Sequence, residues 1–410
     1  MKDYVLSISQ ITIRLVYLLI LISLIASIPQ AISLSQGSLG TVVEKGVGLR
    51  WLREITLIII VGFALLYMIY GLPGFITSGT CVAILIVSVY TIFLFLRTIL
   101  LGYEIIVPIS GTRIFQYVPL VLIAHYISKI TDGQEILNRF ANMLRFYVLV
   151  LVIIGIFQVF LIPPIQGRTF LGSRPFGTFS KANIYGMTMA TCGLWFTLSR
   201  IPHRNKWLIL CTIMSIISGS RAAALASSLL IIYSLYRSCS DKTGKNLILS
   251  ITPFILIFLY LGFSNKTISG REGTEIFALE ARISAWKNAI TNINGIVDLV
   301  FGWGLGLTSN TLSTLVGFNV YNGQVICDSL FVSILGGYGL LGIIFYVIAI
   351  LWTIMHTKSI KVFVFILFQL LLATVFVIFE VFPVNVLLFF LWGILLTSDQ
   401  NKRRPIMDIR

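Results

Sequence analysis

Apolar runs long enough to cross a lipid bilayer recur along almost the whole of this chain. A membrane-spanning helix needs roughly 20 mostly apolar residues, and such runs begin near the first residue and end near the last. Only 11% of the residues are charged, whereas soluble domains average about 25%. The sequence therefore predicts a polytopic membrane protein and excludes a water-soluble enzyme.

The apolar runs divide at their polar interruptions into about twelve candidate spans, which predicts an all-α fold. No repeat or separable soluble domain is visible, so we expect one transmembrane domain over residues 1–410. The first run is too long for the apolar part of a signal peptide, and we interpret it as a retained span. The spans are 13–34, 55–72, 75–96, 114–128, 146–165, 183–199, 206–218, 221–237, 247–264, 327–355, 361–379 and 384–397.

The few charges are strongly unbalanced, with 30 Lys and Arg against 15 Asp and Glu. Cytoplasmic loops of membrane proteins collect Lys and Arg, which favours a layout with both termini inside. The inside loops are then 129–145, 200–206, 237–245, 358–361 and the tail with Lys402. This layout accounts for a little over half of the cations. The remaining cations fall outside, where we interpret them as a binding surface for an anion.

The longest polar interruption, residues 265–326, is predicted to face the periplasm on this layout. Loops of that length rarely lack a function. Residues 280–293 have apolar positions at the spacing of an amphipathic helix, which would lie on the membrane surface with Trp286 at the interface.

Two short motifs place arginines at the outer ends of spans. GSRPFGTFSKANIYG, residues 172–186, contains Arg174 and Asn183, and an ordinary turn before a helix is the structural alternative. SGSRAA, residues 218–223, contains Arg221 between two apolar runs. An arginine at membrane depth costs roughly 2.5 to 3.5 kcal/mol and usually faces a cavity or a ligand. Snorkelling to the interface is the alternative for Arg221.

Three further features lie in or after the large loop. Arg282 is flanked by Glu280 and Trp286, and a solvated helix face would also explain it. GWGLG, residues 302–306, contains Gly304 and would let backbone amides approach a ligand, although loops use glycine freely. Asp328 precedes a long apolar run, where an N-cap is its structural alternative.

Arg113 and Glu380 complete this outer set, in which arginines outnumber acids. Arginine forks suit phosphate oxygens, so a lipid pyrophosphate is the expected anion, and a carboxylate beside it could act as a general base. The cysteines and histidines have no metal-site spacing, so we expect neither a metal nor a cofactor.

The order of these motifs resembles the O-antigen ligase and O-antigen polymerase superfamily. The resemblance covers about residues 108 to 393 and rests on arrangement, because no single motif is specific. The motifs are GTRIFQY (with Arg113), GSRPFGTFSKANIYG, SGSRAA, EARISAWKNAI, GWGLG, CDSLFVSILGGYGLLG and EVFPVN (with Glu380).

The resemblance implies a GT-C-like, lipid-sugar-dependent glycosyltransferase of the bacterial inner membrane, with a periplasmic active site and no metal requirement. It implies that Arg221 and Arg282 hold the donor pyrophosphate, that Arg174 contacts a donor or acceptor phosphate, and that Asp328 accepts the acceptor's proton. The partners would be undecaprenyl-pyrophosphate-linked oligosaccharides and membrane lipids, not nucleic acid. A chain-length regulator is left open as a further partner.

Two alternatives stay open on sequence grounds. Ligases of the superfamily have a histidine just ahead of the last glycine-rich span, whereas this chain has Asp328 there and no histidine over residues 204–355. That difference favours the polymerase over the ligase. A secondary transporter is the alternative from another class, but transporters keep their polar groups near the bilayer midplane and often show repeated halves.

Overall fold

The fold is described from a computed structural model of the chain. The structure describes residues 2–26, 55–60, 62, 78–161, 168–169, 172–179, 181–248, 250, 252, 283–284, 286–317, 320–325 and 329–397. Across these ranges the regular structure is helical apart from one antiparallel ladder, β1 (Arg168–Thr169) with β2 (Gly172–Ser173). The prediction of an all-α fold is confirmed at this level.

Each predicted span that the structure describes contains a helix, although residues 374–379 at the end of the predicted span 361–379 form turns. Most of the predicted spans 55–72 and 247–264 lies outside the described residues. The labelled helices are α1 (Lys2–Ala26), α5 (Ser78–Leu100), α6 (Ile106–Thr112), the 3-10 helix η1 (Arg113–Phe115), α7 (Val118–Ile130), α8 (Gly133–Leu161), α9 (Ala182–Leu198), α10 (Arg204–Ile217), α11 (Arg221–Ser238), α15 (Ile296–Phe301), α16 (Asn310–Val316), α17 (Leu330–Thr357), α18 (Ile360–Ala373) and α19 (Val384–Leu395).

Three helical stretches within the described residues are long and apolar enough to cross a membrane. They are Ile106–Lys129, which joins α6, η1 and α7, then α8 and α17. Shorter apolar helices accompany them at Gln10–Ile25, Ile86–Leu100, Ile360–Ala373 and Val384–Leu395. The described part of the chain therefore has three candidate spans, which indicates a membrane protein, and the predicted count of about twelve is not confirmed.

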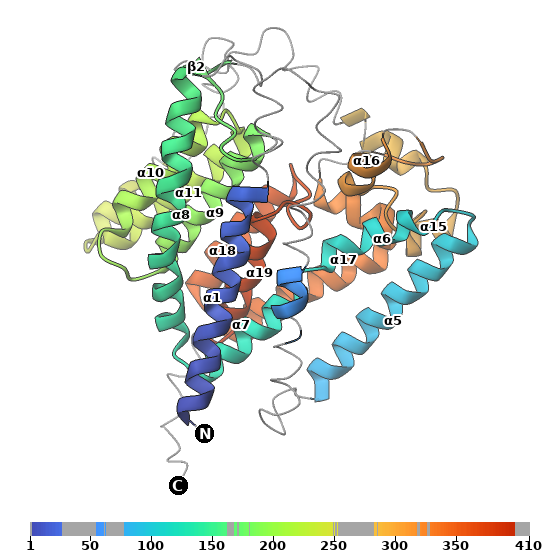
Figure 1. Cartoon of the computed structure of the whole chain (residues 1–410), viewed down its shortest axis with the longest axis horizontal. Coiled ribbons are helices and arrows are strands. Elements are labelled where there is room, and N and C mark those ends of the chain that lie inside the picture. Colours follow the sequence, from blue (N-terminus) through green and yellow to red (C-terminus); the bar gives the residue numbers. More distant parts are fainter. Residues whose placement is uncertain are drawn as a thin grey trace.

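The centre of the molecule is formed by α9 and α19. Every residue of α19 is buried, and so is nearly all of α9. Trp195 of α9 lies 4.6 Å from Phe140 of α8 and 6.1 Å from Phe390 of α19, measured between ring centroids. Figure 1 places α19 between α7 and α9, with α1, α8 and α18 around it. Because α19 has no exposed side, its apolar sequence reflects contact with protein.

Large apolar side chains are exposed on α5, α8 and α17, which marks the outer surface of the helical domain. Examples are Ile92 on α5, Ile153 on α8 and Ile348 on α17. Soluble proteins do not expose such continuous apolar bands. These faces are the expected lipid-contacting surface of the three helices.

Candidate functional site

A buried arginine joins two motifs that are separated in the sequence. Arg174 follows β2 and is only 6% exposed. Its Nε–H donates to the Ser218 carbonyl oxygen at 2.8 Å, and its Nη2 donates to Asn183 Oδ1 at 2.9 Å. Arg174 and Asn183 therefore lie in direct contact, and Arg174 joins the segment 172–179 to the turn between α10 and α11.

A glycine makes this close approach feasible. Gly219 has a positive φ of 67°, and a Cβ placed on it would lie 2.8 Å from Arg174 Nε. The amide of Gly219 donates to the Ile216 carbonyl at 2.9 Å, which closes the turn at the end of α10. The sequence SGSR therefore gives both the tight turn and the room for the guanidinium group.

Arg221 is the first residue of α11, at the same junction. Ser220 is the N-cap of this helix and is 2% exposed. Among the described residues, the Ser220 hydroxyl has no hydrogen-bond partner. The first N–H groups of any α-helix lack intrahelical partners, and the helix dipole makes this end attractive to anions. The junction of Arg174, Asn183, Ser220 and Arg221 thus collects several donors.

Gln158 of α8 forms hydrogen bonds with the loop that carries Arg174. Its Oε1 accepts hydrogen bonds from the amides of Phe176 and Gly177 at 2.9 and 2.6 Å, and its Nε2 donates to the Gly177 carbonyl at 2.6 Å. Sequence reasoning missed Gln158, although a glutamine inside the apolar run of α8 was an available signal. Ser220 was also missed, because serines are common in turns.

A second polar group lies around Glu380, in the turn between α18 and α19. The Thr311 amide of α16 donates to Glu380 Oε2 at 3.3 Å. Oε1 of Glu380 is itself buried and has no hydrogen-bond partner within the part of the chain that the structure describes. Burial raises the pKa of Glu380 from 4.5 to about 7, although hydrogen bonds from Ser309, Thr311 and Asn310 and the charge of Arg113 lower it.

Arg113 lies in η1, on the segment that joins α6 to α7. The positive charge of Arg113 lowers the pKa of the Glu380 carboxyl, so the structure brings Arg113 and Glu380 close enough to interact. Ser309 connects this group to α6, since its Oγ donates to the Ser110 carbonyl at 3.3 Å and accepts from the Thr311 amide at 3.1 Å.

The GWGLG segment packs against α17. Gly302 has a positive φ of 80°, and a Cβ on it would lie 2.4 Å from the Gly336 carbonyl oxygen. The Gly304 amide donates to that same oxygen at 3.4 Å. Close contact with the backbone of α17 therefore explains why glycines occur in this segment. The role of Gly304 in ligand contact stays a prediction.

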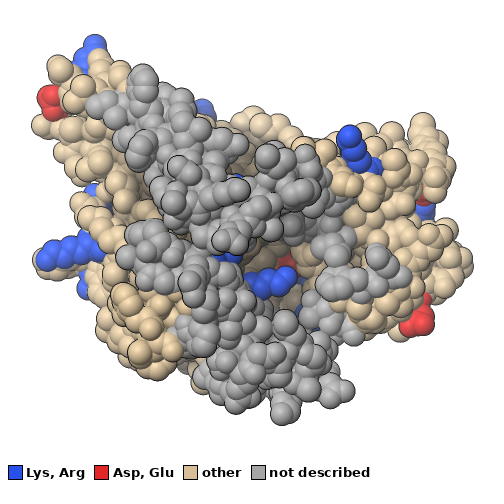
Figure 2. Space-filling model, turned by 90° about the horizontal axis from the view of Figure 1, so that it is seen from above, with Lys and Arg blue, Asp and Glu red and all other residues tan. Residues whose placement is uncertain are grey.

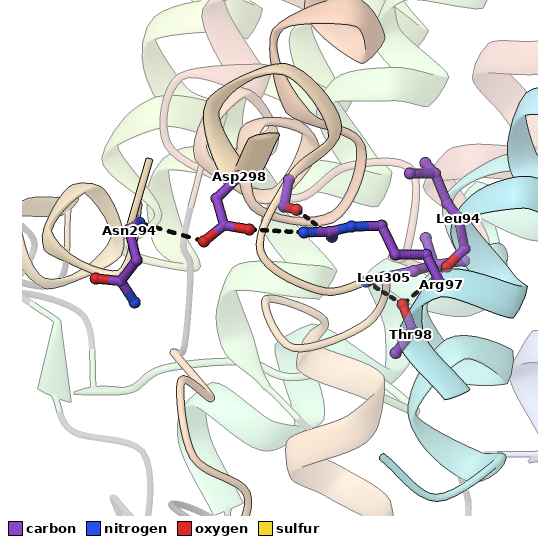
Figure 3. Close-up of polar contacts among 7 residues, drawn as sticks. Leu94, Arg97, Thr98, Asn294, Asp298 and Leu305 are labelled. Atoms are coloured by element: carbon purple, nitrogen blue, oxygen red, sulfur yellow. Dashed lines mark hydrogen bonds and ion pairs between the residues drawn. The ribbon is translucent and has the colours of Figure 1, made fainter. Parts of the chain in front are cut away.

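An ion pair ties this segment to α5. Arg97 Nη2 lies 2.6 Å from Asp298 Oδ1, and Arg97 Nη1 donates to the Gly302 carbonyl at 2.6 Å. The Leu305 amide donates to Thr98 Oγ1 at 2.9 Å, as Figure 3 shows beside the Arg97–Asp298 pair. The loop between α15 and α16 is thus held to the end of α5 by side chains one residue apart.

The helix predicted over 280–293 is present at residues 286–291, but its single apolar face divides in two. Ala289 is fully buried in a cluster with Val107, Trp303, Leu307 and Leu312. Ile290 is 56% exposed, and Ile283 is also exposed. Trp286 is half-buried, and its Nε1 has no hydrogen-bond partner among the residues described.

Three predicted site residues, Glu280, Arg282 and Asp328, lie outside the described residues. The predictions of a second pyrophosphate-binding arginine and of the general base therefore stay predictions. No group of three or more His, Cys, Asp and Glu side chains that could hold a metal occurs in the described ranges.

Basic side chains surround a hollow at one end of the molecule. Figure 2 looks onto the end that carries β2 and α16 in Figure 1. Lys and Arg side chains are visible at the rim of the central hollow, and acidic atoms are visible in its depth. A surface of this kind attracts an anion.

The described residues therefore offer two candidate groups, the arginine junction and the Glu380 carboxyl with Arg113. Comparison with protein-family models and with curated proteins found no match for this chain.

Proposed function

We propose that this chain is an undecaprenyl-pyrophosphate-dependent glycosyltransferase of the O-antigen polymerase type. It transfers a growing glycan from one undecaprenyl pyrophosphate to the non-reducing end of another lipid-linked repeat unit. The observation that carries the proposal is the junction at which Arg174 bonds both to Asn183 and to the carbonyl of Ser218, just ahead of Ser220 and Arg221 at the start of α11.

The junction fits a pyrophosphate for electrostatic reasons. A cation at the first position of a helix is disfavoured by the helix dipole, and a bound anion reverses that penalty. The Ser220 hydroxyl is a buried donor available to such an anion, and Arg221 would supply a bidentate fork. Arg174 already spends donors on Ser218 and Asn183, so it would position the turn that carries Arg221.

The reaction forms one bond to the anomeric carbon and breaks another. The acceptor hydroxyl oxygen bonds to the anomeric carbon, and the bond from that carbon to the pyrophosphate oxygen breaks with inversion. The hydroxyl proton passes to a carboxylate, and undecaprenyl pyrophosphate leaves with its charge stabilised by arginines. The resemblance assigns the proton to Asp328. Glu380 is the described alternative, because a pKa of about 7 leaves it partly ionised at neutral pH.

The cations at the helix ends opposite the site support a periplasmic location of the site. The start of α8 meets the α9–α10 turn, where the Arg200 amide donates to Asn138 Oδ1 at 2.7 Å and Arg145 donates to the Pro202 carbonyl. The pKa of Arg204 is lowered, mainly by burial and also by repulsion from the neighbouring charges of Arg237 and Arg200. Such a concentration of cations is typical of the cytoplasmic side.

A reconstituted assay tests the activity. Purified protein in lipid vesicles, supplied with lipid-linked repeat units and no nucleotide sugar, should produce a ladder of longer products. Arg221→Ala should abolish the ladder, and Arg221→Lys should restore little of it, because a point charge does not replace the fork. Arg237→Ala is the matched control, since Arg237 is exposed in the last turn of the same helix. A ladder that survives Arg221→Ala would overturn the proposal.

A deletion strain separates the polymerase from the ligase. Loss of a polymerase should leave lipopolysaccharide capped by a single repeat unit. Bare core with accumulated undecaprenyl-linked polymer would assign the chain to the ligases instead.

A further inference from the structure

The segment around α15 exposes an unusual amount of apolar surface for a part of the chain predicted to lie in a polar loop. None of the residues of α15 is buried. Ile296 is 77% exposed and Val297 is 54% exposed. Leu299, Ile290 and Ile283 are exposed as well. We call these five aliphatic residues the α15 surface.

The helix α15 packs against two long helices that carry exposed apolar faces. Phe301 of α15 lies 5.3 Å from Phe93 of α5, measured between ring centroids. The carbonyl of Val300 lies so close to Gly339 of α17 that a Cβ there would be 2.2 Å away. Leu96 of α5 and Leu340 of α17, each near one of these contacts in sequence, are exposed. Figure 1 shows α15 beside the end of α5.

The segment has few charges, and its one acidic side chain is neutralised by an ion pair, as an apolar environment requires. Over residues 283–301 the ionisable side chains are Lys287 and Asp298. Asp298 pairs with Arg97 at 2.6 Å and also accepts from the Asn294 amide at 3.2 Å. Lys287 is exposed, and its long side chain can reach headgroup phosphates. A solvated loop would need no such neutralisation of its one acid.

We propose that the α15 surface is inserted into the acyl-chain region of the outer leaflet. Its occupant is phospholipid, because the surface extends the exposed bands of α5 and α17, one of which belongs to a candidate membrane span. Moving five exposed aliphatic side chains from water into hydrocarbon is favourable. The proposal is independent of the glycosyltransferase activity.

Photo-crosslinking to lipid tests the proposal. The photoreactive residue p-benzoylphenylalanine replaces Ile296 in the full chain, which is purified and placed in vesicles of phosphatidylethanolamine and phosphatidylglycerol. After illumination, mass spectrometry should find lipid adducts at a yield within about two-fold of that from the same residue at Ile92. Ile92 is exposed on α5, and Lys242, exposed in the predicted loop 237–245, is the water-facing control, which should give no adduct.

Two results would overturn the proposal. A dimer band from position 296 would mean that a second copy of the chain covers this surface. An adduct yield equal to that at Lys242 would mean that water covers it. Each variant is first shown to elute as a single peak in detergent with the thermal midpoint of the unsubstituted chain, so that misfolding does not imitate either result.

Discussion

At the scale of single residues, the site depends on polar groups placed in an apolar surrounding. Gln158, Arg174 and Ser220 are each at least nine-tenths buried, and burial makes every unmade hydrogen bond costly. The Glu380 carboxyl differs from them, because one of its oxygens is enclosed and lacks a partner among the described residues.

Glu380 gives a pH dependence whose sign follows from its raised pKa. Between pH 4.5 and about 7 the folded state keeps a proton on Glu380 that the unfolded state has lost. The stability that Glu380 contributes is therefore fully present below pH 4.5 and is lost as the pH rises to about 7. Thermal unfolding of the purified protein in detergent should therefore shift to lower temperature across this window. Glu380→Gln cannot ionise and should flatten that part of the profile. An unchanged slope in Glu380→Gln would assign the dependence to another group.

At the scale of elements, apolar patterns locate helices well but not their surroundings. Local hydropathy alone placed α17 and α18, because each run differs from the polar turns beside it. The prediction for α8 was partly wrong, because this helix begins at Gly133 and includes residues 133–145, which were predicted as an inside loop. Helical spacing over 280–293 predicted one apolar face. Two apolar environments exist, however: Ala289 enters a protein core while Ile290 stays outside. Periodicity cannot tell protein from lipid, so the face facing the membrane was not predictable.

The site was predictable only as a set of motifs. Arg221 was recognisable because an arginine at membrane depth is expensive, and Arg174 because it lies in a glycine- and proline-containing loop before a span. Their connection through Ser218 and Asn183 joins residues 44 and 9 positions apart along the chain. Gln158 supports a loop 18 or 19 residues away. Tertiary contacts of this kind leave no periodic trace in a sequence.

The support by Gln158 has a measurable consequence for the loop. Gln158→Leu would leave the amides of Phe176 and Gly177 buried without their acceptor, at a cost of about 1 to 3 kcal/mol. Hydrogen exchange at these two amides should accelerate by about ten-fold or more. Gln369→Leu applies the same substitution to a buried glutamine of α18, which bonds to Tyr346, and should leave both amides unchanged. Equal protection in both variants would refute the supporting role.

At the scale of the whole molecule, the distribution of charge defines two ends. The described arginines and lysines beyond the site concentrate at the starts of α8, α10 and α18 and at the end of α11. Lys361 of α18 donates to Gln134 of α8 there, which joins two of these helix ends. The proposed site lies at the other ends of the same helices.

Cysteine labelling checks the orientation. Lys181→Cys lies at the N-cap of α9 on the site end, and Lys242→Cys follows α11 on the opposite end; both positions are exposed. In a background with Cys81, Cys239 and Cys327 replaced by serine, only the buried Cys192 and Cys211 remain. A membrane-impermeant maleimide added to intact spheroplasts should then label position 181 and leave 242 unlabelled until the membrane is permeabilised. The reverse order would place the site in the cytoplasm, and labelling of both would deny that the two ends face opposite sides.

The burial of α19 has a consequence for how the protein is made. A helix of 12 residues spans about 18 Å, which falls short of a hydrocarbon layer of about 30 Å. Alone in a bilayer, its ends would leave backbone groups unsatisfied within the hydrocarbon. The segment therefore depends on α7, α8 and α9 for a place in the membrane, and biogenesis of this chain has to deliver it to neighbours that are already assembled.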